Sequence, residues 1–329
     1  MRAVSLIAIV VLLISCKNES CRNVPEASPE SVSLEIERME AQLFNASNPL
    51  EIENFLRENT AIAEGLMHSD QYPALSTLSS RLSGLIRDPH IDTLYREATN
   101  TFEDYEEQFR EEMETAFGWL KYYYPETETP TVQTMVTGLY NDVYITDSLL
   151  VLSIDFFIGE DASFRPLDLP QYILRRYSSE YMVPTMMKFY LDSYAKTGKE
   201  NSLLSEMIDY GKLYYFIGKI LPCMEDWRIM GYTEEEMRES KENQEIIWAN
   251  FIENEILYDN TEEMKRRFLG ERPKVYEIGE SCPGRIGAWV GWEIVKAYAE
   301  RSGASLKEIM EETDHHRIFS ESKYKPVNQ

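Results

Sequence analysis

The sequence predicts an α+β fold that is mostly helical, with a small β-sheet in the first half and a helical C-terminal part. Three observations indicate this class. Apolar residues recur at helical spacing between residues 34 and 124, residues 131–158 are rich in β-branched and aromatic side chains, and helical patterns return over residues 169–320. No internal repeat interrupts this order, so we expect a single globular body over residues 34–329.

The first residues have the organisation of a secretory signal peptide. Arg2 precedes an apolar run that is shorter than the roughly 20 apolar residues needed to span a bilayer. The run ends at Leu13-Ile14-Ser15-Cys16, which resembles a bacterial lipobox. We therefore expect residues 1–15 to be removed and Cys16 to carry acyl chains such as palmitate, which would anchor the protein without spanning the membrane. A plain secretory signal that contains a cysteine is the alternative.

Residues 16–33 are predicted to form a flexible, lipidated tether. This segment is rich in Ser, Pro, Asn and Glu, and it has too few apolar side chains to fold by itself. Three cysteines remain after Cys16, namely Cys21, Cys223 and Cys282. A disulfide between Cys223 and Cys282 is one option, but their spacing carries no signature, so the sequence favours unpaired, buried thiols.

The clearest helix is predicted between Thr101 and Tyr124. Its apolar side chains repeat every three or four residues and form one stripe. The stripe consists of Phe102, Tyr105, Phe109, Met113, Ala116, Phe117 and Leu120. Thr101 is a suitable N-cap for this helix, and Pro125 follows its end.

The β-rich segment comes next and is divided by turn residues at 138–142 and 146–148. We expect two or three strands there. Five helical segments are predicted after the sheet. They cover residues 169–196, 202–222, 233–258, 283–298 and 305–314.

The composition is strongly acidic. The chain has 33 Lys and Arg residues against 57 Asp and Glu residues, which gives a formal net charge of −24. This charge argues against a nucleic-acid partner, and it also repels anionic lipid headgroups. We therefore expect the membrane to be reached through the N-terminal lipid and not through a basic patch.

The sequence contains no catalytic or metal-binding motif that we recognise. Its four histidines, His68, His90, His315 and His316, include no pair four residues apart, as the helix of a zinc peptidase requires. Gly-x-Ser-x-Gly and Walker patterns are absent as well. We therefore predict no metal site, no small-molecule cofactor and no catalytic residues, and we expect a protein that is not an enzyme.

A glycine-rich and tryptophan-rich stretch opens the segment at residues 283–298. Its signature residues are Pro283, Gly284, Arg285, Gly287, Trp289, Gly291 and Trp292. The three glycines are three and four residues apart, so on a helix they share one face that another backbone could approach closely. A phosphate-binding loop would need Gly-x-Gly-x-x-Gly after a strand, so we favour packing over a ligand site. The two tryptophans would then belong to the core, and Pro283 suits a first helical turn.

Arg175, Arg176 and Arg285 lie close to aromatic residues in this acidic chain. Ion pairing with the surplus carboxylates is the simpler interpretation. The alternative is a polar pocket in which Arg285 meets a carboxylate of a partner.

Several stretches, taken in order, resemble the gliding-motility lipoprotein B family of the Bacteroidetes. These are the lipobox at Cys16, Ile154–Gly159, Leu169–Ile173 followed by Arg175-Arg176, residues 202–222, Gly231-Tyr232-Thr233, Asn243 with Trp248, Pro283–Gly287, Gly291–Val295 and Ser322–Pro326. The resemblance implies a lipoprotein of the cell envelope that faces the periplasm and works with other gliding or secretion proteins.

That family is similar in turn to predicted zinc peptidases of the gluzincin type, which implies a zincin-like shape. In such peptidases one helix carries His-Glu-x-x-His, and a later Glu-Gly pair brings the third zinc ligand. Here residues 172–194 contain no histidine, and the later position resembles Tyr210-Gly211, followed by Lys212. The resemblance therefore implies a degenerate peptidase scaffold that lacks its zinc ligands.

The leading hypothesis is a non-enzymatic envelope lipoprotein that acts through protein–protein contacts. One rival is an envelope hydrolase acting on peptide or peptidoglycan, for which Asp192, Glu206 and Asp209 are the candidate residues because they lie on the helices that resemble the ligand helices. Another rival is a lipoprotein that binds a glycan or a nutrient through its aromatic residues.

Overall fold

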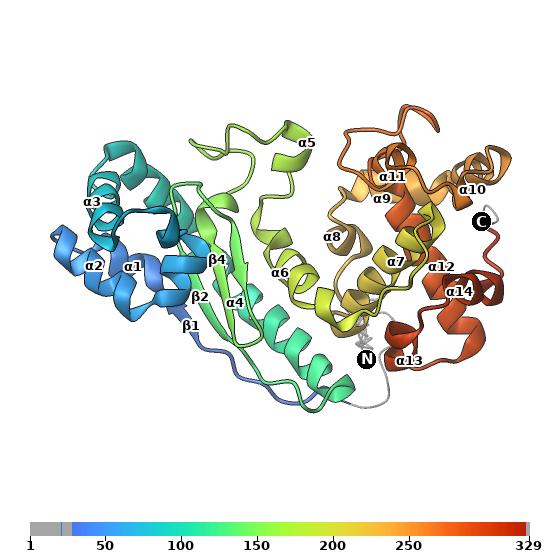
Figure 1. Ribbon diagram of the computed structural model, residues 1–329, viewed down its shortest axis with the longest axis horizontal. Coiled ribbons are helices and arrows are strands. Elements are labelled where there is room, and N and C mark those ends of the chain that lie inside the picture. Colours follow the sequence, from blue (N-terminus) through green and yellow to red (C-terminus); the bar gives the residue numbers. More distant parts are fainter. Residues whose placement is uncertain (1–20, 22–27, 327–329) are drawn as a thin grey trace, which may run out of the picture.

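The computed structural model describes Cys21 and residues 28–326. The signal peptide and the lipidation site predicted at Cys16 lie outside the described residues. The predicted class is confirmed, because a small sheet in the first half is followed by a helical second half (Figure 1). Within the described residues, no helix has both the length and the apolar character needed to cross a bilayer.

The described residues of the first half contain four α-helices. They are α1 (Met39–Phe44), α2 (Pro49–Glu58), α3 (Leu75–Leu85) and α4 (Pro89–Tyr123). The long helix α4 contains the predicted apolar stripe, but it begins before Thr101, where the sequence analysis placed its start. Asp88 is the actual N-cap, since its carboxylate accepts a hydrogen bond from the amide of His90, and Pro89 occupies the first turn.

The sheet has four strands in the order β1-β2-β4-β3. These are β1 (Ile36–Arg38), β2 (Thr131–Met135), β3 (Val143–Ile145) and β4 (Leu149–Ser153). Strands β1, β2 and β4 are parallel, and β3 runs antiparallel to β4. The prediction of helix throughout residues 34–124 was wrong at β1, where Ile36 pairs with Val132 far along the chain. The sheet also ends at Ser153, because Ile154–Phe156 form a 3₁₀ turn.

Both faces of the sheet are buried. On β4, Leu150 and Leu152 belong to the apolar cluster that includes α4, and Val151 belongs to the cluster that includes α1, α2 and α3. Figure 1 shows α4 and these three helices on opposite sides of the sheet. Alternate side chains of a strand point to opposite faces, so this short strand contributes to both apolar clusters. The larger cluster continues without a break from α4 and the sheet to the helices of the second half.

Ten α-helices make up the second half. They are α5 (Gln171–Leu174), α6 (Met182–Tyr190), α7 (Leu203–Ile220), α8 (Asp226–Met230), α9 (Glu234–Glu242), α10 (Gln244–Glu253), α11 (Glu262–Phe268), α12 (Ile286–Ser302), α13 (Leu306–Glu311) and α14 (His315–Ser322). The segment predicted as one helix over 169–196 is broken. Ser178 has an extended backbone, and the carbonyl of Tyr177 accepts a hydrogen bond from Gly159 instead of continuing a helix.

Two further boundaries differ from the prediction. The segment 233–258 is divided at Asn243 into α9 and α10, with a 3₁₀ turn at its end. Helix α12 begins at Ile286, so Pro283 does not occupy a helical turn. Pro283 instead forms an isolated antiparallel bridge with Lys274.

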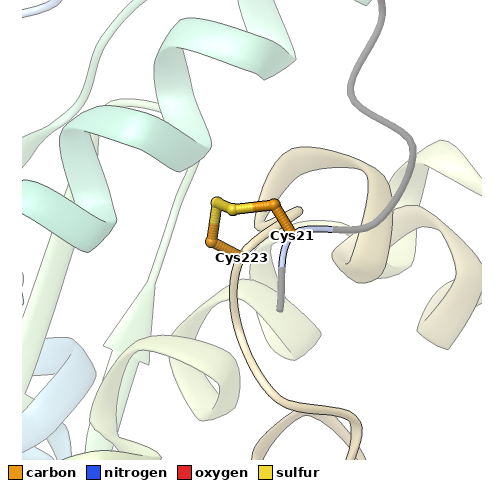
Figure 2. Close-up of a disulfide and its surroundings, with 2 residues drawn as sticks. All are labelled: Cys21 and Cys223. Atoms are coloured by element: carbon orange, nitrogen blue, oxygen red, sulfur yellow. A yellow bond between two sulfur atoms is a disulfide. The ribbon is translucent and has the colours of Figure 1, made fainter. Parts of the chain in front are cut away.

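The predicted tether is attached to the body at more than one point. Cys21 forms a disulfide with Cys223, which follows the end of α7 (Figure 2). The amide of Glu30 donates a hydrogen bond to the carbonyl of Gly118 on α4. The prediction of a flexible tether is therefore wrong at Cys21 and Glu30, and the prediction of unpaired thiols is wrong at Cys21 and Cys223. Cys282 is a buried free cysteine, so the Cys223–Cys282 disulfide does not form.

A buried carboxylate holds the turn that follows β2. Asp155 accepts hydrogen bonds from the amides of Thr137, at 3.2 and 3.3 Å, and Leu139, at 2.7 Å. Gly138 and Leu139 both have left-handed backbones in this turn, with φ of 72° and 62°. Burial raises the pKa of Asp155 to about 6, although the backbone hydrogen bonds act in the opposite direction.

We expect this carboxyl group to make the stability of the fold depend on pH. Because the folded-state pKa is above the ordinary value of 3.8, the protonated form stabilises the fold at low pH, and this contribution is lost as the pH rises through about 6. The loss is roughly 1–3 kcal/mol of unfolding free energy. Urea unfolding between pH 4 and pH 7 measures it against Asp155→Asn, which does not titrate. Parallel pH profiles for the two proteins would contradict the expectation.

Candidate binding site

A basic pocket of about 250 Å³ lies between α6, α7, the end of α8 and the loop before α12. Its charged lining residues are Asp142, Arg176, Lys188, Arg228, Glu271 and Arg285. Four of these six side chains are basic, in a chain whose net charge is −24. The pocket is therefore a local reversal of the overall charge.

Arg285 lines the basic pocket, and its guanidinium is held mainly by backbone carbonyls. Its backbone is left-handed, with φ of 58°, immediately before α12 begins. The guanidinium donates hydrogen bonds to the carbonyls of Met230, at 2.8 Å, and Gly231, at 2.9 Å, and to the hydroxyl of Tyr214, at 3.3 Å. It also lies over the ring of Tyr232. These contacts hold the end of α8 against the start of α12.

Glu271 links two of the arginines. Both of its oxygens accept hydrogen bonds from Arg176, at 3.0 and 2.6 Å, and Arg285 Nε lies 3.5 Å from Oε1. Burial acts to raise the pKa of Glu271, but Arg176, Arg285 and Lys188 outweigh it, so the pKa is lower than usual. Ion pairing, the simpler interpretation of the arginines, is therefore what the structure shows for Arg176 and Arg285.

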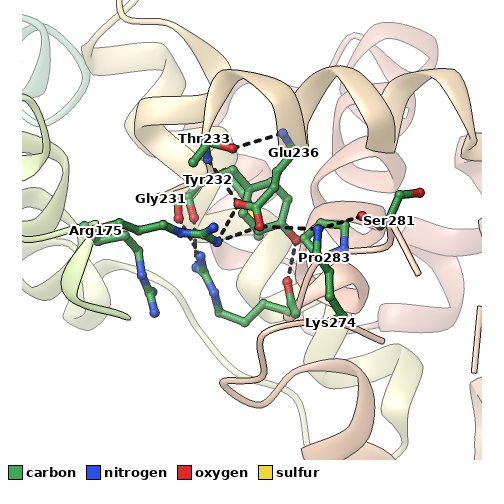
Figure 3. A network of polar contacts seen from close by, with 12 residues as sticks. Arg175, Gly231, Tyr232, Thr233, Glu236, Lys274, Ser281 and Pro283 are labelled. Carbon is green, nitrogen blue, oxygen red and sulfur yellow. Dashed lines mark hydrogen bonds and ion pairs between the residues drawn. The ribbon is translucent and has the colours of Figure 1, made fainter. Parts of the chain in front are cut away.

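Arg175 points away from the basic pocket. Its guanidinium lies 2.6 Å from both oxygens of Glu236, and Lys274 approaches the same carboxylate to 4.0 Å (Figure 3). Glu236 also completes a capping box with Thr233 at the start of α9. Arg175 therefore ties the segment after α5 to α9.

Lys188 is the cation of the pocket that has no anion of its own. Its ammonium group lies 6.0 Å from the ring centre of Tyr214, and we find no hydrogen bond or ion pair for it among the described residues. Burial acts to raise the pKa of Tyr214, yet Lys188, Arg285 and Arg176 together lower it below its ordinary value. A fully buried hydroxyl with a lowered pKa indicates a positive potential inside the pocket.

The predicted glycine face is a packing surface. A Cβ atom on Gly291 would lie 1.7 Å from the carbonyl oxygen of Met207 on α7, and one on Gly287 would lie 3.1 Å from the Leu269 side chain. Gly284 precedes the helix and closely approaches the backbone of Arg272 instead. The two tryptophans of this stretch, Trp289 and Trp292, are buried in the core as expected.

The signature residues on α7 do not join the basic pocket. Gly211 faces the backbone of Gly291, where it lets α7 and α12 come close. Lys212 is buried and donates hydrogen bonds to the carbonyls of Lys196, at 2.7 Å, and Glu312, at 2.8 Å. Tyr210 is partly exposed on the outer side. Their contacts are structural.

The three acidic residues named for a hydrolase do not line the basic pocket. Glu206 pairs with Lys265, and Asp209 lies 2.8 Å from Nε2 of the buried His315. Asp192 is exposed after α6. Sequence reasoning named two of the residues that line the pocket, Arg176 and Arg285, but it missed Lys188, whose only signal was a single charge on the otherwise largely apolar helix α6.

The zinc of the peptidases that the family resembles does not fit these residues. Helix α6 lies within the segment likened to the ligand helix, and it presents Thr185 and Lys188 to the pocket. Zinc is bound by thiolate, imidazole or carboxylate groups, and the ammonium and guanidinium groups present here would repel it. In the part of the chain that the structure describes, no three His, Cys, Asp or Glu side chains are grouped so as to hold a metal ion.

Fold and pocket together define a mostly helical α+β protein with a small, basic pocket. The family model for gliding motility protein GldB matches residues 20–326, which is nearly the whole chain. The chain therefore belongs to the GldB family of gliding-motility lipoproteins, and such lipoproteins are components of the cell envelope. No curated protein and no solved structure matches it.

Proposed function

We propose that the protein is a non-catalytic lipoprotein of the gliding machinery, anchored through Cys16, that binds an acidic group of an envelope partner in the basic pocket. The observation that carries this proposal is Lys188. It is a half-buried cation without an anionic partner among the described residues, in a pocket whose other cations are already held by carboxylates or carbonyls.

The charge of the pocket selects the class of ligand. Arg228 is paired with Glu112, whereas Arg176 and Arg285 share the single carboxylate of Glu271. The positive charge that remains for a bound anion therefore comes from Lys188 and from this shared arginine pair. Electrostatic complementarity of this kind gives specificity and rapid association. Elsewhere the acidic surface repels anions, which makes this pocket the favoured place for a carboxylate to dock.

The size of the pocket favours one side chain or a chain terminus of a protein partner. Its volume, about 250 Å³, is below the roughly 300–1,000 Å³ typical of sites for small molecules. Phe189 is half exposed at the rim and offers apolar surface to the groups that flank the acidic one. This size does not suit a glycan or a nutrient, for which the larger cavity beside Cys21, of about 870 Å³ with Tyr215, Trp227 and Trp292 in its lining, would be the better candidate.

The chemistry of the pocket supports binding without catalysis. A general base needs a carboxylate or imidazole whose pKa is close to the working pH. The pKa of Glu271 is lowered and its oxygens are held by Arg176 and Arg285, so it is a weak base. Asp142 already accepts a hydrogen bond from the hydroxyl of Tyr177, at 2.7 Å. Glu271 thus holds cations in place and Asp142 holds a hydroxyl group, so neither carboxylate is placed to activate a nucleophile.

Charge reversal at Lys188 is the test in cells. A photoreactive phenylalanine analogue at Phe189 should form a covalent adduct with the partner, and Lys188→Glu should reduce that adduct at least about tenfold and impair gliding, because like charges in one site repel. Lys199→Glu is the matched control, since it changes the net charge equally on an exposed lysine outside the pocket.

Two results would contradict the proposal. The first is normal gliding and an undiminished adduct in Lys188→Glu. The second is stoichiometric zinc in the purified protein together with cleavage of a peptide or peptidoglycan substrate, which would show that the protein is an enzyme. Circular dichroism on both variants confirms that they fold.

A further inference from the structure

The disulfide lies in the turn between the two helices α7 and α8. Cys223 is exposed in this turn, which joins Ile220 at the end of α7 to Asp226 at the start of α8 (Figure 2). It is bonded to Cys21, which is separated from it by 202 residues of sequence. The beginning of the chain is thus fixed to the second half of the fold.

The position of Cys21 determines how far the body can stand from its anchor. Five peptide units separate Cys16 from Cys21. A fully extended chain covers at most about 3.3–3.6 Å per residue, so the segment from Cys16 to Cys21, which we call the leash, reaches roughly 17 Å. The next observed attachment is the hydrogen bond from Glu30 to Gly118, fourteen residues after Cys16, and a leash of that length would reach roughly 48 Å.

We infer that the Cys21–Cys223 disulfide holds the face of the protein around Cys223 against the lipid headgroups. This inference rests on the proposed lipid anchor at Cys16. The turn at Cys223 cannot move farther from the membrane than the short leash allows, whereas the rest of the body is free to extend away from it. We call the surface around this turn the disulfide face, and define it by Cys223, Trp227 and the nine charged residues that line the cavity beside Cys21.

The composition of the disulfide face suits this position. A cavity beside Cys21 is lined by four basic side chains, Lys219, Arg238, Lys241 and Lys296, and by five acidic ones, Glu225, Asp226, Glu234, Glu242 and Glu300. This near balance contrasts with the net charge of −24 for the whole chain. Anionic headgroups therefore repel this face less than the average surface of the protein. Trp227 is half-buried at the same place, and tryptophan is favoured at membrane interfaces.

Crosslinking from the lipid side tests the inference. The acylated full-length protein is reconstituted in vesicles of phosphatidylethanolamine and phosphatidylglycerol that contain a lipid with a photoreactive headgroup, and the crosslinked peptides are identified by mass spectrometry. We expect peptides from residues 219–242 to be at least about fivefold enriched over those from residues 49–85, which form α2 and α3 in the first half.

Two insertions of fifteen Gly and Ser residues separate the effect of leash length from that of folding. Placed between Asn18 and Glu19, the insertion leaves both cysteines intact but lengthens the leash, and the enrichment should fall to less than about twofold. Placed between Pro25 and Glu26, after Cys21, the same insertion leaves the leash unchanged and the enrichment should persist. The double variant Cys21→Ser with Cys223→Ser should behave like the first insertion.

The outcomes distinguish this inference from the proposed anchor. If the protein stays on the vesicles and the insertion before Cys21 leaves the enrichment intact, the disulfide does not orient the body and the inference is wrong. If the wild-type protein is released from the vesicles as readily as Cys16→Ser, the anchor itself is wrong. Mass measurement without reductant verifies the disulfide in each insertion variant.

Discussion

Gly291→Ala should lower the free energy of unfolding by about 3 kcal/mol or more, at the upper end of what overpacking costs. A methyl group there would lie 1.7 Å from the carbonyl oxygen of Met207, well inside contact distance. Backbone cannot move aside as a side chain can, and Gly211 on the facing helix is itself in close contact with the backbone of Gly291. Alanine improves helix propensity by up to about 1 kcal/mol, which is too little to offset the clash.

Gly84→Ala is the matched control for this substitution. Gly84 also lies in a helix, α3, but a Cβ atom there meets nothing within 4 Å. We expect this variant to be neutral or more stable by up to about 1 kcal/mol. Urea unfolding followed by circular dichroism measures both variants. A loss of less than 1 kcal/mol in Gly291→Ala would mean that α7 and α12 can separate without cost.

Arg228→Met should cost about 3–5 kcal/mol of unfolding free energy. The guanidinium of Arg228 forms two hydrogen bonds of 2.8 Å with the carboxylate of Glu112 on α4, and a third of 2.9 Å with Tyr105. It also donates to the carbonyl of Glu180. Methionine fills much of the same volume, so the loss comes mainly from the carboxylate of Glu112, which remains largely buried without its partner.

A double variant shows whether the uncompensated charge of Glu112 causes the loss of stability in Arg228→Met. Arg228→Met with Glu112→Leu removes both ions, and we expect it to recover at least half of the lost stability. Arg238→Met, which breaks an exposed pair with Glu242, should change stability by less than about 0.5 kcal/mol. If the double variant is less stable than Arg228→Met alone, the pair itself stabilises the fold and our explanation is incorrect.

The sequence predicts the helices and strands of this protein better than it predicts where helices begin or break and which distant strands pair. The stripe on α4 could be identified because Phe102, Phe109 and Met113 repeat at helical spacing, and all three are buried. The start of α4 was placed too late because the residues before Thr101 are mostly polar. Strand β1 has only three residues and pairs in parallel with β2, so no local alternation indicated it.

The candidate site was also predicted only where the residues lie close together in the sequence. The spacing of the glycines predicts close packing of a helix, and Gly287 and Gly291 do pack closely. The basic pocket instead depends on Lys188, Tyr214 and Glu271, which come from three separate segments. The partner of Cys223 was equally hidden, because Cys21 lies in a segment whose composition argues against any fixed structure.

The disulfide also determines where a mechanical load enters the fold. Strand β1 is three residues long and lies at the edge of the sheet, so a pull on the N-terminus applied there would peel it from β2 one hydrogen bond at a time. With Cys21 bonded to Cys223, tension from a lipid at Cys16 bypasses β1 and reaches the end of α7. Helix α7 is packed along α12, so a load applied to α7 must slide the buried surfaces of these two helices past each other. A lipoprotein of the gliding machinery that is pulled through its proposed anchor would gain strength from this route.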